Sequence, residues 1–453
     1  MEALFTSIHG GDAIRRKLMD LVEEASALAA LHRVDVHVMA FSFTDEAIAE
    51  ALLRAAELRP RLTVRLLADW GQRTLERGQQ TGRLADAGLA NLMIRYTLDQ
   101  PYVWDAEAGH MRWSYHASRG LLHHKTLGVL VEGKPWKLAC GSFNWTAKAV
   151  KSYENLLVLS AGDPESRMIA SRIEFEFEAL WSEGNVSLSV GEARAHYQAI
   201  LESYRRDPTM APSRVAGIGG GLGEPIEELD GDPLEVANAE IAFSSRPRGD
   251  SRREAGFASK NRERRMVLCS AGGRRRLVPV SITNLALDAI FQTKEGELLE
   301  VALYGFSPRV AEYGALLEAA RRGAKLRLLL DRDSGRDTAA RLAALREQGL
   351  PIEIRTVGRM MHEKYLVWPD KGMVVTGTAN FSTDASARHW EHRLRISGNQ
   401  LLAAQYSADF REIWSRLTEE GKGKVSLPLT SSERSAKGSS ERSLTEEGCW
   451  CQG

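Results

Sequence analysis

The chain has 453 residues, 43% of them hydrophobic, and its 60 basic and 60 acidic residues give a formal net charge of zero. A chain of this length can bury two full domain cores. The net charge of zero excludes a strongly basic protein, for which the charge alone would indicate nucleic-acid binding. No apolar run reaches bilayer-spanning length and the first residues lack an export signal, so we expect no transmembrane segment. Four cysteines without a regular framework fit a reducing compartment, and we expect a cytoplasmic protein.

The first predicted elements are a strand, a helix and a second strand. Residues 34–44 form an apolar run that ends in an aromatic and a hydroxyl residue, residues 46–58 are rich in Ala, Leu and Arg, and residues 62–69 are again apolar and end in Asp69. Apolar runs that alternate with a helical pattern indicate an α/β domain.

The next predicted strand carries the sequence His123-His124-Lys125. Side chains alternate along a strand, so His123 and Lys125 share one face, whereas His124 points to the other face and is expected to be structural. A further strand leads into a turn with Ser142 and Asn144, after which come Glu154 and an amphipathic helix that ends near Trp181.

The same series of elements returns in the second half of the chain. The strand of residues 300–307 and the helix of residues 311–322 precede a strand that ends in Asp331. The second set of motif residues is His362, Lys364, Thr378, Asn380 and Glu391, followed by a helix that ends near Trp414. A repeat of this extent indicates a duplicated domain.

We therefore expect an α/β fold made of two domains, each with a mixed sheet flanked by helices, related by a pseudo-twofold axis. The first domain would span residues 1–202 and the second residues 233–425. A flexible linker is expected over residues 203–232, which include a glycine-rich stretch, and a disordered tail over residues 426–453, which are rich in Ser, Glu, Lys and Gly. The two motif strands would meet at the interface, so that a monomer is sufficient for one site.

The paired motifs resemble those of the phospholipase D superfamily, whose signature is HxKxxxxD followed by GSxN. His123, Lys125, Ser142 and Asn144 match in the first half, and His362, Lys364, Thr378 and Asn380 match in the second. The signature Asp is replaced by Leu130 and by Pro369. The resemblance covers residues 29–417 and is nearest to the nuclease-like and cardiolipin-hydrolase-like branch.

The resemblance implies a phosphodiesterase that works through a phosphohistidine. Lys125 and Lys364 would neutralise the phosphate oxygens without a metal. His123 would be the nucleophile and His362 the acid, with the reverse order as the alternative, because imidazole can serve in both roles near neutral pH.

The remaining motif residues would support this chemistry. Glu154 and Glu391 are candidates to hold the other ring nitrogen of the histidines. Ser142 and Thr378 would donate hydroxyl hydrogen bonds to the phosphate, and Asn144 and Asn380 would donate amide hydrogen bonds. We expect no cofactor and no metal, because the His and Cys residues have no metal-ligand spacing.

The substrate stays open between three alternatives. A nuclease acting on DNA or RNA is favoured by an aromatic insertion before His123 and by an Arg-rich run over residues 246–276. The insertion contains Tyr96, Tyr102, Trp104, Trp113 and Tyr115, and it could instead be a self-packed loop. The other two alternatives are a phospholipase or phosphatidyl transferase acting on phospholipid and a non-catalytic phosphate-binding scaffold.

Overall fold

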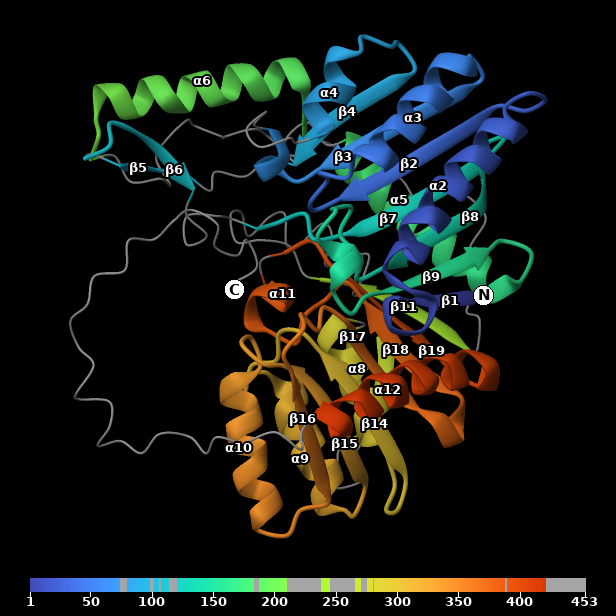
Figure 1. Ribbon diagram of the computed structural model, residues 1–453, viewed down its shortest axis with the longest axis vertical. Helices are drawn as coiled ribbons and strands as arrows, with labels where there is room; N and C mark the ends of the chain where they lie inside the picture. The colour runs from blue at the N-terminus through green and yellow to red at the C-terminus, as the bar shows by residue number, and fades with distance from the viewer. Residues whose placement is uncertain are drawn as a thin grey trace.

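Two mixed β-sheets with flanking helices make up the computed structural model (Figure 1). The structure describes residues 1–73, 80–97, 102–105, 107–113, 120–182, 187–209, 238–244, 265–269, 275–279, 281–387 and 389–420. Each sheet belongs to one half of the chain, so the expected fold class is confirmed.

The first sheet has eight strands in the order β1-β9-β8-β7-β2-β3-β4-β10. Strands β2, β3 and β4 are parallel, and the others pair antiparallel. The strands are β1 (Glu2–Phe5), β2 (Val34–Ala40), β3 (Leu62–Ala68), β4 (Leu92–Thr97), β7 (Lys125–Val131), β8 (Lys134–Gly141), β9 (Asn155–Ser160) and β10 (Ser187–Ser189). Its helices are α1 (Thr6–His9), α2 (Gly11–Leu28), α3 (Glu46–Leu58), α4 (Gln80–Asp86), α5 (Pro164–Ser182) and α6 (Val190–Arg206), with 3-10 turns η1 (Trp70–Arg73) and η3 (Ala149–Lys151).

The second sheet has seven strands in the order β11-β19-β18-β17-β14-β15-β16. Strands β14, β15 and β16 are parallel and correspond to β2, β3 and β4. The strands are β11 (Ala239–Phe243), β14 (Leu298–Leu303), β15 (Lys325–Asp331), β16 (Ile352–Val357), β17 (Lys364–Trp368), β18 (Met373–Gly377) and β19 (His392–Ile396). Its helices are α8 (Ile282–Phe291), α9 (Ala311–Arg321), α10 (Arg336–Glu347), α11 (Thr383–Ala387) and α12 (Gln400–Glu420), with a 3-10 turn η5 (Pro369–Lys371).

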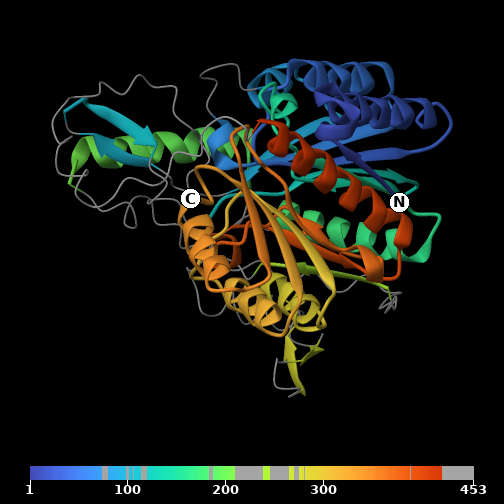
Figure 2. The same ribbon diagram turned by 60° about the horizontal axis from the view of Figure 1, so that its bottom comes forward.

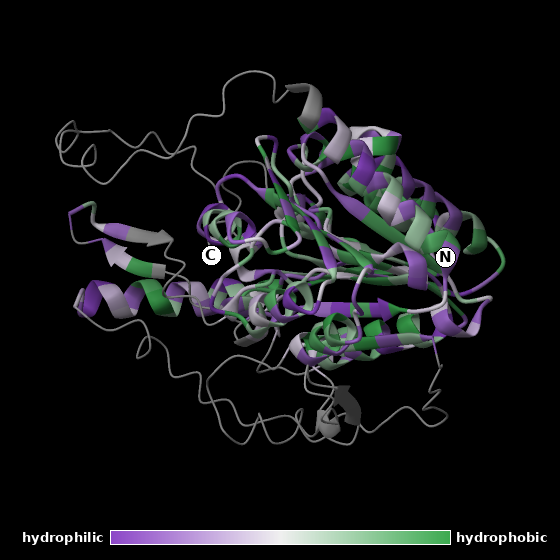
Figure 3. Ribbon diagram, turned by 90° about the horizontal axis from the view of Figure 1, so that it is seen from below, coloured by the Kyte–Doolittle hydropathy of each residue, from purple (hydrophilic) through white to green (hydrophobic). Residues whose placement is uncertain are grey.

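The apolar side chains form a core on the outer side of each sheet and a third core that both halves share. The shared core contains residues of α5 and α12 together with residues of both sheets. Within it Phe5 of the first half lies edge-to-face on Tyr406 of the second, with ring centroids 4.9 Å apart. Figure 2 shows α12, in red, lying across the junction between the halves. Figure 3 shows green, hydrophobic stretches on the strands of the two sheets, with white and purple positions between them.

A small arm extends from the first half beyond α4 and β4 (Figure 1). It consists of the hairpin of β5 (Tyr102–Asp105) and β6 (His110–Trp113) together with α6, and we call it the aromatic arm. Trp104 stacks on Tyr204 of α6 with ring centroids 6.2 Å apart. Part of the aromatic insertion is thus packed within the arm, whereas Tyr96 lies in β4 and is buried in the sheet.

The structure shows where the last helix of the first half ends relative to the expected linker. The linker was expected to begin at residue 203, but α6 continues to Arg206, because Tyr204 is buried and holds that last turn. The glycine-rich stretch, the tail and most of the Arg-rich run lie outside the described residues. Two pieces of the Arg-rich run form a separate hairpin, β12 (Arg265–Cys269) and β13 (Arg275–Pro279). In the described part of the chain, no helix combines the length and apolar character needed to cross a membrane.

Candidate active site

The two motif strands begin at the junction between the halves, and each begins against a segment of the opposite half. The backbone N–H of His123 donates to the Trp390 carbonyl at 3.0 Å, and the N–H of His362 donates to the Tyr153 carbonyl at 2.9 Å. β7 and β17 begin at Lys125 and Lys364, so each histidine lies just before its strand rather than within it. His123, Lys125, His362 and Lys364 are all buried, and Lys125, Lys364 and His362 all act electrostatically on His123, so these residues of two distant sequence regions lie in one site.

Each histidine is held by a glutamate of the other half. Nδ1 of His123 lies 2.9 Å from Glu391, and Nδ1 of His362 lies 2.9 Å from Glu154. Both glutamates are fully buried. A complete histidine–glutamate pair therefore requires both halves of the chain.

The hydroxyl residues of the motifs support the glutamates. The Ser142 hydroxyl donates to Glu154 at 2.5 Å and accepts the Asn155 backbone N–H at 2.9 Å. Thr378 accepts the His392 N–H at 3.1 Å and hydrogen-bonds Glu391. Both hydroxyls are fully buried. This corrects the expectation that Ser142 and Thr378 donate to phosphate, because each is buried against its glutamate and positions that carboxylate.

The glycine before each hydroxyl residue is required by the close approach of two strands. A Cβ at Gly141 would lie 2.4 Å from the Asn155 carbonyl oxygen, and a Cβ at Gly377 would lie 2.4 Å from the His392 carbonyl oxygen. Gly377 also has a φ of 145°, a backbone conformation that residues with a side chain rarely adopt. The absence of a side chain at these two glycines therefore lets β8 approach β9, and β18 approach β19, at the place where each hydroxyl contacts its glutamate.

The motif asparagines lie in the two turns that follow the hydroxyl residues. The Oδ1 atoms of Asn144 and Asn380 are buried and have no hydrogen-bond partner among the described residues. Asn380 packs so closely on Gly305 that a Cβ at that glycine would lie 3.3 Å from its side chain. Each half thus contributes one buried amide oxygen in the turn after its hydroxyl residue.

The two lysines bring positive charge to both histidines. Each ammonium donates to the carbonyl of the histidine two residues earlier, Lys125 at 2.6 Å and Lys364 at 2.5 Å. Burial is the main cause that lowers the pKa of His123 well below its ordinary value, and both lysine charges lower it further. Burial also lowers the pKa of His362, where Glu154 acts in the opposite direction. Because the charge of each lysine reaches both histidines, the two half-sites act as one electrostatic unit.

The structure adds two pairs of residues to the site, one pair from each of two positions in the repeat, to which the motifs assigned no role. Phe41 and Tyr304 lie edge-on to His123 and His362, with ring centroids 4.9 Å and 5.0 Å apart. Lys125 lies 5.1 Å from the Phe41 ring centroid, and Lys364 lies 5.2 Å from the Tyr304 ring centroid. These aromatic rings at the ends of the predicted strands therefore form a wall of each half-site.

The second pair consists of the aspartates that end the second strand of each half. Asp69 accepts the Leu122 backbone N–H at 2.8 Å, and Asp331 accepts the Met361 N–H at 3.2 Å. Leu122 and Met361 are the residues immediately before the motif histidines. The position of each aspartate at the end of the second predicted strand of its half was the available sequence signal.

Behind the site, the residue between each histidine and lysine points away from it, as expected for His124. His124 stacks on His392 with ring centroids 5.2 Å apart, and both rings are fully buried. In the other half this position is Glu363, which faces Asp409. Burial is the main cause that raises the pKa of Glu363 well above its ordinary value, and the Asp409 charge adds to it. These residues pack behind the site and do not line it.

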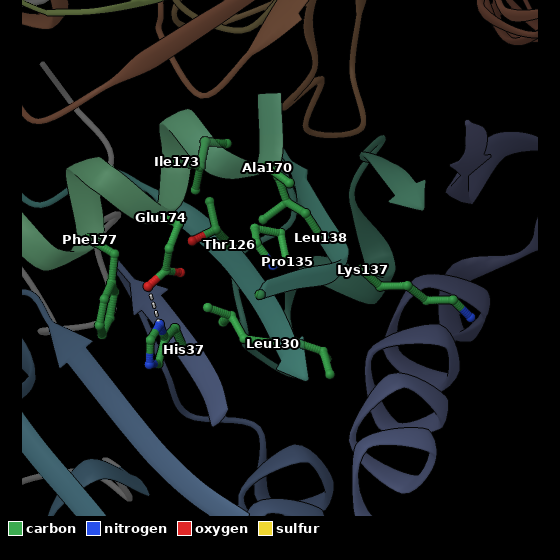
Figure 4. Close-up of a pocket in the computed structure, with 12 residues that line it drawn as sticks. His37, Thr126, Leu130, Pro135, Lys137, Leu138, Ala170, Ile173, Glu174 and Phe177 are labelled. Atoms are coloured by element: carbon green, nitrogen blue, oxygen red, sulfur yellow. Dashed lines mark hydrogen bonds and ion pairs between the residues drawn. The ribbon is translucent and has the colours of Figure 1, made fainter. Parts of the chain in front are cut away.

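One cluster elsewhere has the composition of a metal site but not its chemistry. Ligand atoms of His37, Glu174 and Glu178 lie within 4.8 Å of one another. Nδ1 of His37 lies 2.5 Å from Glu174, as Figure 4 shows, and Nε2 accepts a hydrogen bond from Arg65 at 2.9 Å. Arg65 also pairs with Glu178. The guanidinium supplies the positive charge, so the cluster fits a buried ion-pair network and not a cation site.

Comparison with known proteins agrees with this geometry. A sequence model of the family described as "Cardiolipin synthase, PLD-like domain" matches residues 26–181 and 287–414, one segment in each half. The chain belongs to this phospholipase D-like family. The expected membership and duplication are thereby confirmed.

Curated relatives of this phospholipase D-like chain match shorter regions. A protein named Phospholipase D from Rickettsia prowazekii (strain Madrid E) is 30% identical over 123 residues, which are 27% of this chain and 58% of the relative. A Mitochondrial cardiolipin hydrolase from Xenopus tropicalis is 27% identical over 117 residues, 26% of this chain and 54% of the relative. The chain thus spans a little over half the length of these relatives.

A solved structure matches both halves together. The phosphatidylserine synthase of Haemophilus influenzae Rd KW20 is similar with a TM-score of 0.50 at 12% identity, over 87% of this chain and 84% of that one. At this identity the likeness shows the fold alone.

Proposed function

We propose that this protein is a metal-independent phosphodiesterase that works through a covalent phosphohistidine. The observation that carries the proposal is the crossed arrangement of two buried histidine–glutamate pairs with two buried lysines. A glutamate at Nδ1 leaves Nε2 of each ring for chemistry, and the lysines supply positive charge for an anionic transition state.

His123 is the proposed nucleophile. In the reactive state its Nδ1–H donates to Glu391, and the lone pair on Nε2 attacks phosphorus while the bond to the leaving oxygen breaks. The lysine charges and burial both favour the neutral form of this ring, which is the nucleophilic form.

His362 is the proposed acid and base. It gives its Nε2 proton to the leaving oxygen in the first step; in the second step it takes a proton from water, whose oxygen attacks phosphorus as the P–N bond breaks. Glu154 favours the protonated form of this ring, whereas the lysines oppose it. The Nε2 atom is buried and has no partner among the described residues, which suits an atom that exchanges a proton with substrate.

Lys125 and Lys364 would hold the phosphate oxygens, and the side-chain amides of Asn144 and Asn380 would donate to them. This assignment requires each ammonium to turn from the histidine carbonyl that it contacts here. A long flexible side chain can make that change within the site.

The proposed substrate is a strand of DNA or RNA. Support comes from the position of the aromatic arm: Lys125 is in register with Ala40, Ala40 with Ala68 and Ala68 with Tyr96, and the arm begins a few residues after Tyr96. The arm therefore begins at the same ends of the strands as the motif histidines. A polymeric substrate could be bound there on either side of the cleaved phosphate. A cytoplasmic location stays a prediction from the cysteine content.

Phospholipid is the second candidate substrate. The observation in its favour is the name of the Rickettsia relative, Phospholipase D, whose matching region is 30% identical to this chain. Headgroup release and nucleic-acid cleavage break the same kind of bond, so the proposed mechanism serves both.

The test incubates wild-type and His123→Ala protein in EDTA with labelled single- and double-stranded DNA and RNA, and in parallel with phosphatidylcholine and cardiolipin vesicles. We expect cleavage of nucleic acid that persists in EDTA and is lost in the variant. Lipid release alone would assign the same mechanism to the second substrate. Loss of all activity in EDTA, restored by a divalent cation, would overturn the metal-independent mechanism.

A further inference from the structure

The two half-sites differ at one position close to a reacting histidine. Glu154 is preceded by Ser152 and Tyr153, and Glu391 is preceded by His389 and Trp390. The backbone in these segments is symmetric, because Tyr153 and Trp390 both bridge to the residues that lead into the opposite motif histidine. The second half therefore carries an imidazole where the first half carries a small hydroxyl.

The imidazole of His389 lies beside the proposed nucleophile. The ring centroids of His389 and His123 are 6.1 Å apart, and the His389 residue is 5% exposed. This distance is short enough for one phosphoryl group attached to His123 to contact both rings.

A hydrogen bond fixes the protonation state of His389. Its Nδ1 accepts the backbone N–H of Leu121 at 3.0 Å. A ring nitrogen that accepts a hydrogen bond carries no proton, so the proton of this neutral ring is on Nε2. His389 is thus a neutral N–H donor, and it cannot act as a base at Nε2 in this tautomer.

We propose that His389 is a further phosphate-contacting residue, which donates its Nε2–H to a non-bridging oxygen of the phosphoryl group on His123. The proposal rests on the function above and deepens it, because it gives the two histidines unequal surroundings. A donor on the His123 side stabilises the covalent phosphoryl group there, whereas the His362 side, with Ser152, has no corresponding imidazole. His123 is therefore assigned the nucleophilic role by the asymmetry of the site.

Two substitutions separate this contact from the hydrogen bond to Leu121. In His389→Asn, the side-chain oxygen takes the place of Nδ1 and can still accept the Leu121 N–H, but the donor at the Nε2 position is gone. In His389→Gln, the longer side chain brings an N–H to about the Nε2 position. Ser152→Ala is the matched control in the other half.

The experiment measures the binding of orthovanadate, a mimic of the phosphoryl group in transfer, to the full-length protein by calorimetry. We expect His389→Asn to weaken binding by about tenfold, as the loss of one donor to a charged group predicts, and His389→Gln and Ser152→Ala to stay within about threefold of wild type. Single-turnover formation of the phosphoenzyme should fall by about 10²-fold in His389→Asn. Thermal unfolding of each variant verifies its fold.

Wild-type affinity and rate in a folded His389→Asn protein would overturn the proposal. Equal losses in the Asn and Gln variants would also overturn it, since an N–H restored near the Nε2 position would then make no difference to binding or rate. Vanadate binding that depends on His389 in a protein that cleaves no phosphodiester would reject the proposed function and leave the contact standing.

Discussion

At the scale of single residues, the two motif histidines each contact a glutamate of the other half but have different electrostatic surroundings. Burial lowers the pKa of both rings, but Glu154 opposes this lowering at His362, whereas the charges of Lys125 and Lys364 act on the pKa of His123 in the same direction as burial. This difference is the physical basis for giving the two rings different roles. It also makes their substitution effects distinguishable.

Replacement of His123 and replacement of His362 should have different kinetic consequences. His123→Ala should remove phosphoenzyme formation with every substrate, because no nucleophile remains. His362→Ala should slow cleavage of an ordinary ester by about 10²- to 10⁴-fold but have a small effect on a p-nitrophenyl ester, whose leaving group needs no proton. Rapid-quench kinetics with both substrate types check this. Equal losses of His362→Ala activity on both esters would contradict the acid role.

The pH dependence should follow the His123–Glu391 pair. Burial raises the pKa of Glu391 to about 8, against the charges of Lys125 and Lys364. Below that pH the carboxyl is protonated and donates to Nδ1, so the proton of neutral His123 is on Nε2 and blocks attack. Above it the carboxylate accepts Nδ1–H and Nε2 becomes free.

We therefore expect kcat/KM to rise with pH through an apparent pKa of about 8, a property of the coupled pair and not of one residue. The measurement is the pH profile of kcat/KM for wild type and Glu391→Gln. The variant should lose this rising limb, while Glu154→Gln should keep it. An unchanged limb in Glu391→Gln would contradict the assignment.

At the scale of elements, the glycines of the motifs set how closely two pairs of strands approach. The Asn155 carbonyl oxygen lies only 2.4 Å from the position that a Cβ of Gly141 would take, which is too close for a real Cβ. Strand backbones cannot yield as a flexible side chain can. The spacing of β8 and β9 is therefore coupled directly to the hydrogen bond between Ser142 and Glu154.

We expect Gly141→Ala to lower the free energy of unfolding by about 1–3 kcal/mol through overpacking, and to reduce activity as the strands separate. Gly162→Ala is a suitable control, since a Cβ there would meet nothing within 4 Å. Chemical denaturation of both variants gives the comparison. A Gly141→Ala protein as stable as the control would show that the strands adjust without cost.

Much at this scale could be predicted from the sequence. The order of strands and helices follows from apolar runs and the repeat, and the motif residues were recognised because each half supports the other. The pairing of His123 with Glu391, and of His362 with Glu154, could not be predicted, because spacing along a chain does not determine which half supplies a contact. The hydroxyls of Ser142 and Thr378 were misassigned for a related reason: a hydroxyl donates equally well to a phosphate or to a buried carboxylate.

At the scale of the whole molecule, both halves share a core and one site. The shared core around α5 and α12 keeps the halves together, and the crossed pairs lie at the same junction. The molecule therefore contains one complete site formed within one chain.

A mixture of His123→Ala and His362→Ala proteins should show no recovery of activity, because each chain lacks one histidine of its only site. The measurement is the rate of the mixture against the sum of the two variants alone, after joint refolding and at several concentrations. Recovery toward about a quarter of wild-type activity would indicate exchange of halves between chains.

The crossed pairs also have a consequence for the chain while it is being synthesised on the ribosome. The first half emerges with His123 but without its carboxylate, and with Glu154 but without its histidine. Glu391 is the last of the ten motif residues to be synthesised. Under the proposed function, we therefore expect a nascent or prematurely terminated chain to cleave no phosphodiester, because a complete histidine–glutamate pair forms only when the second half has folded against the first.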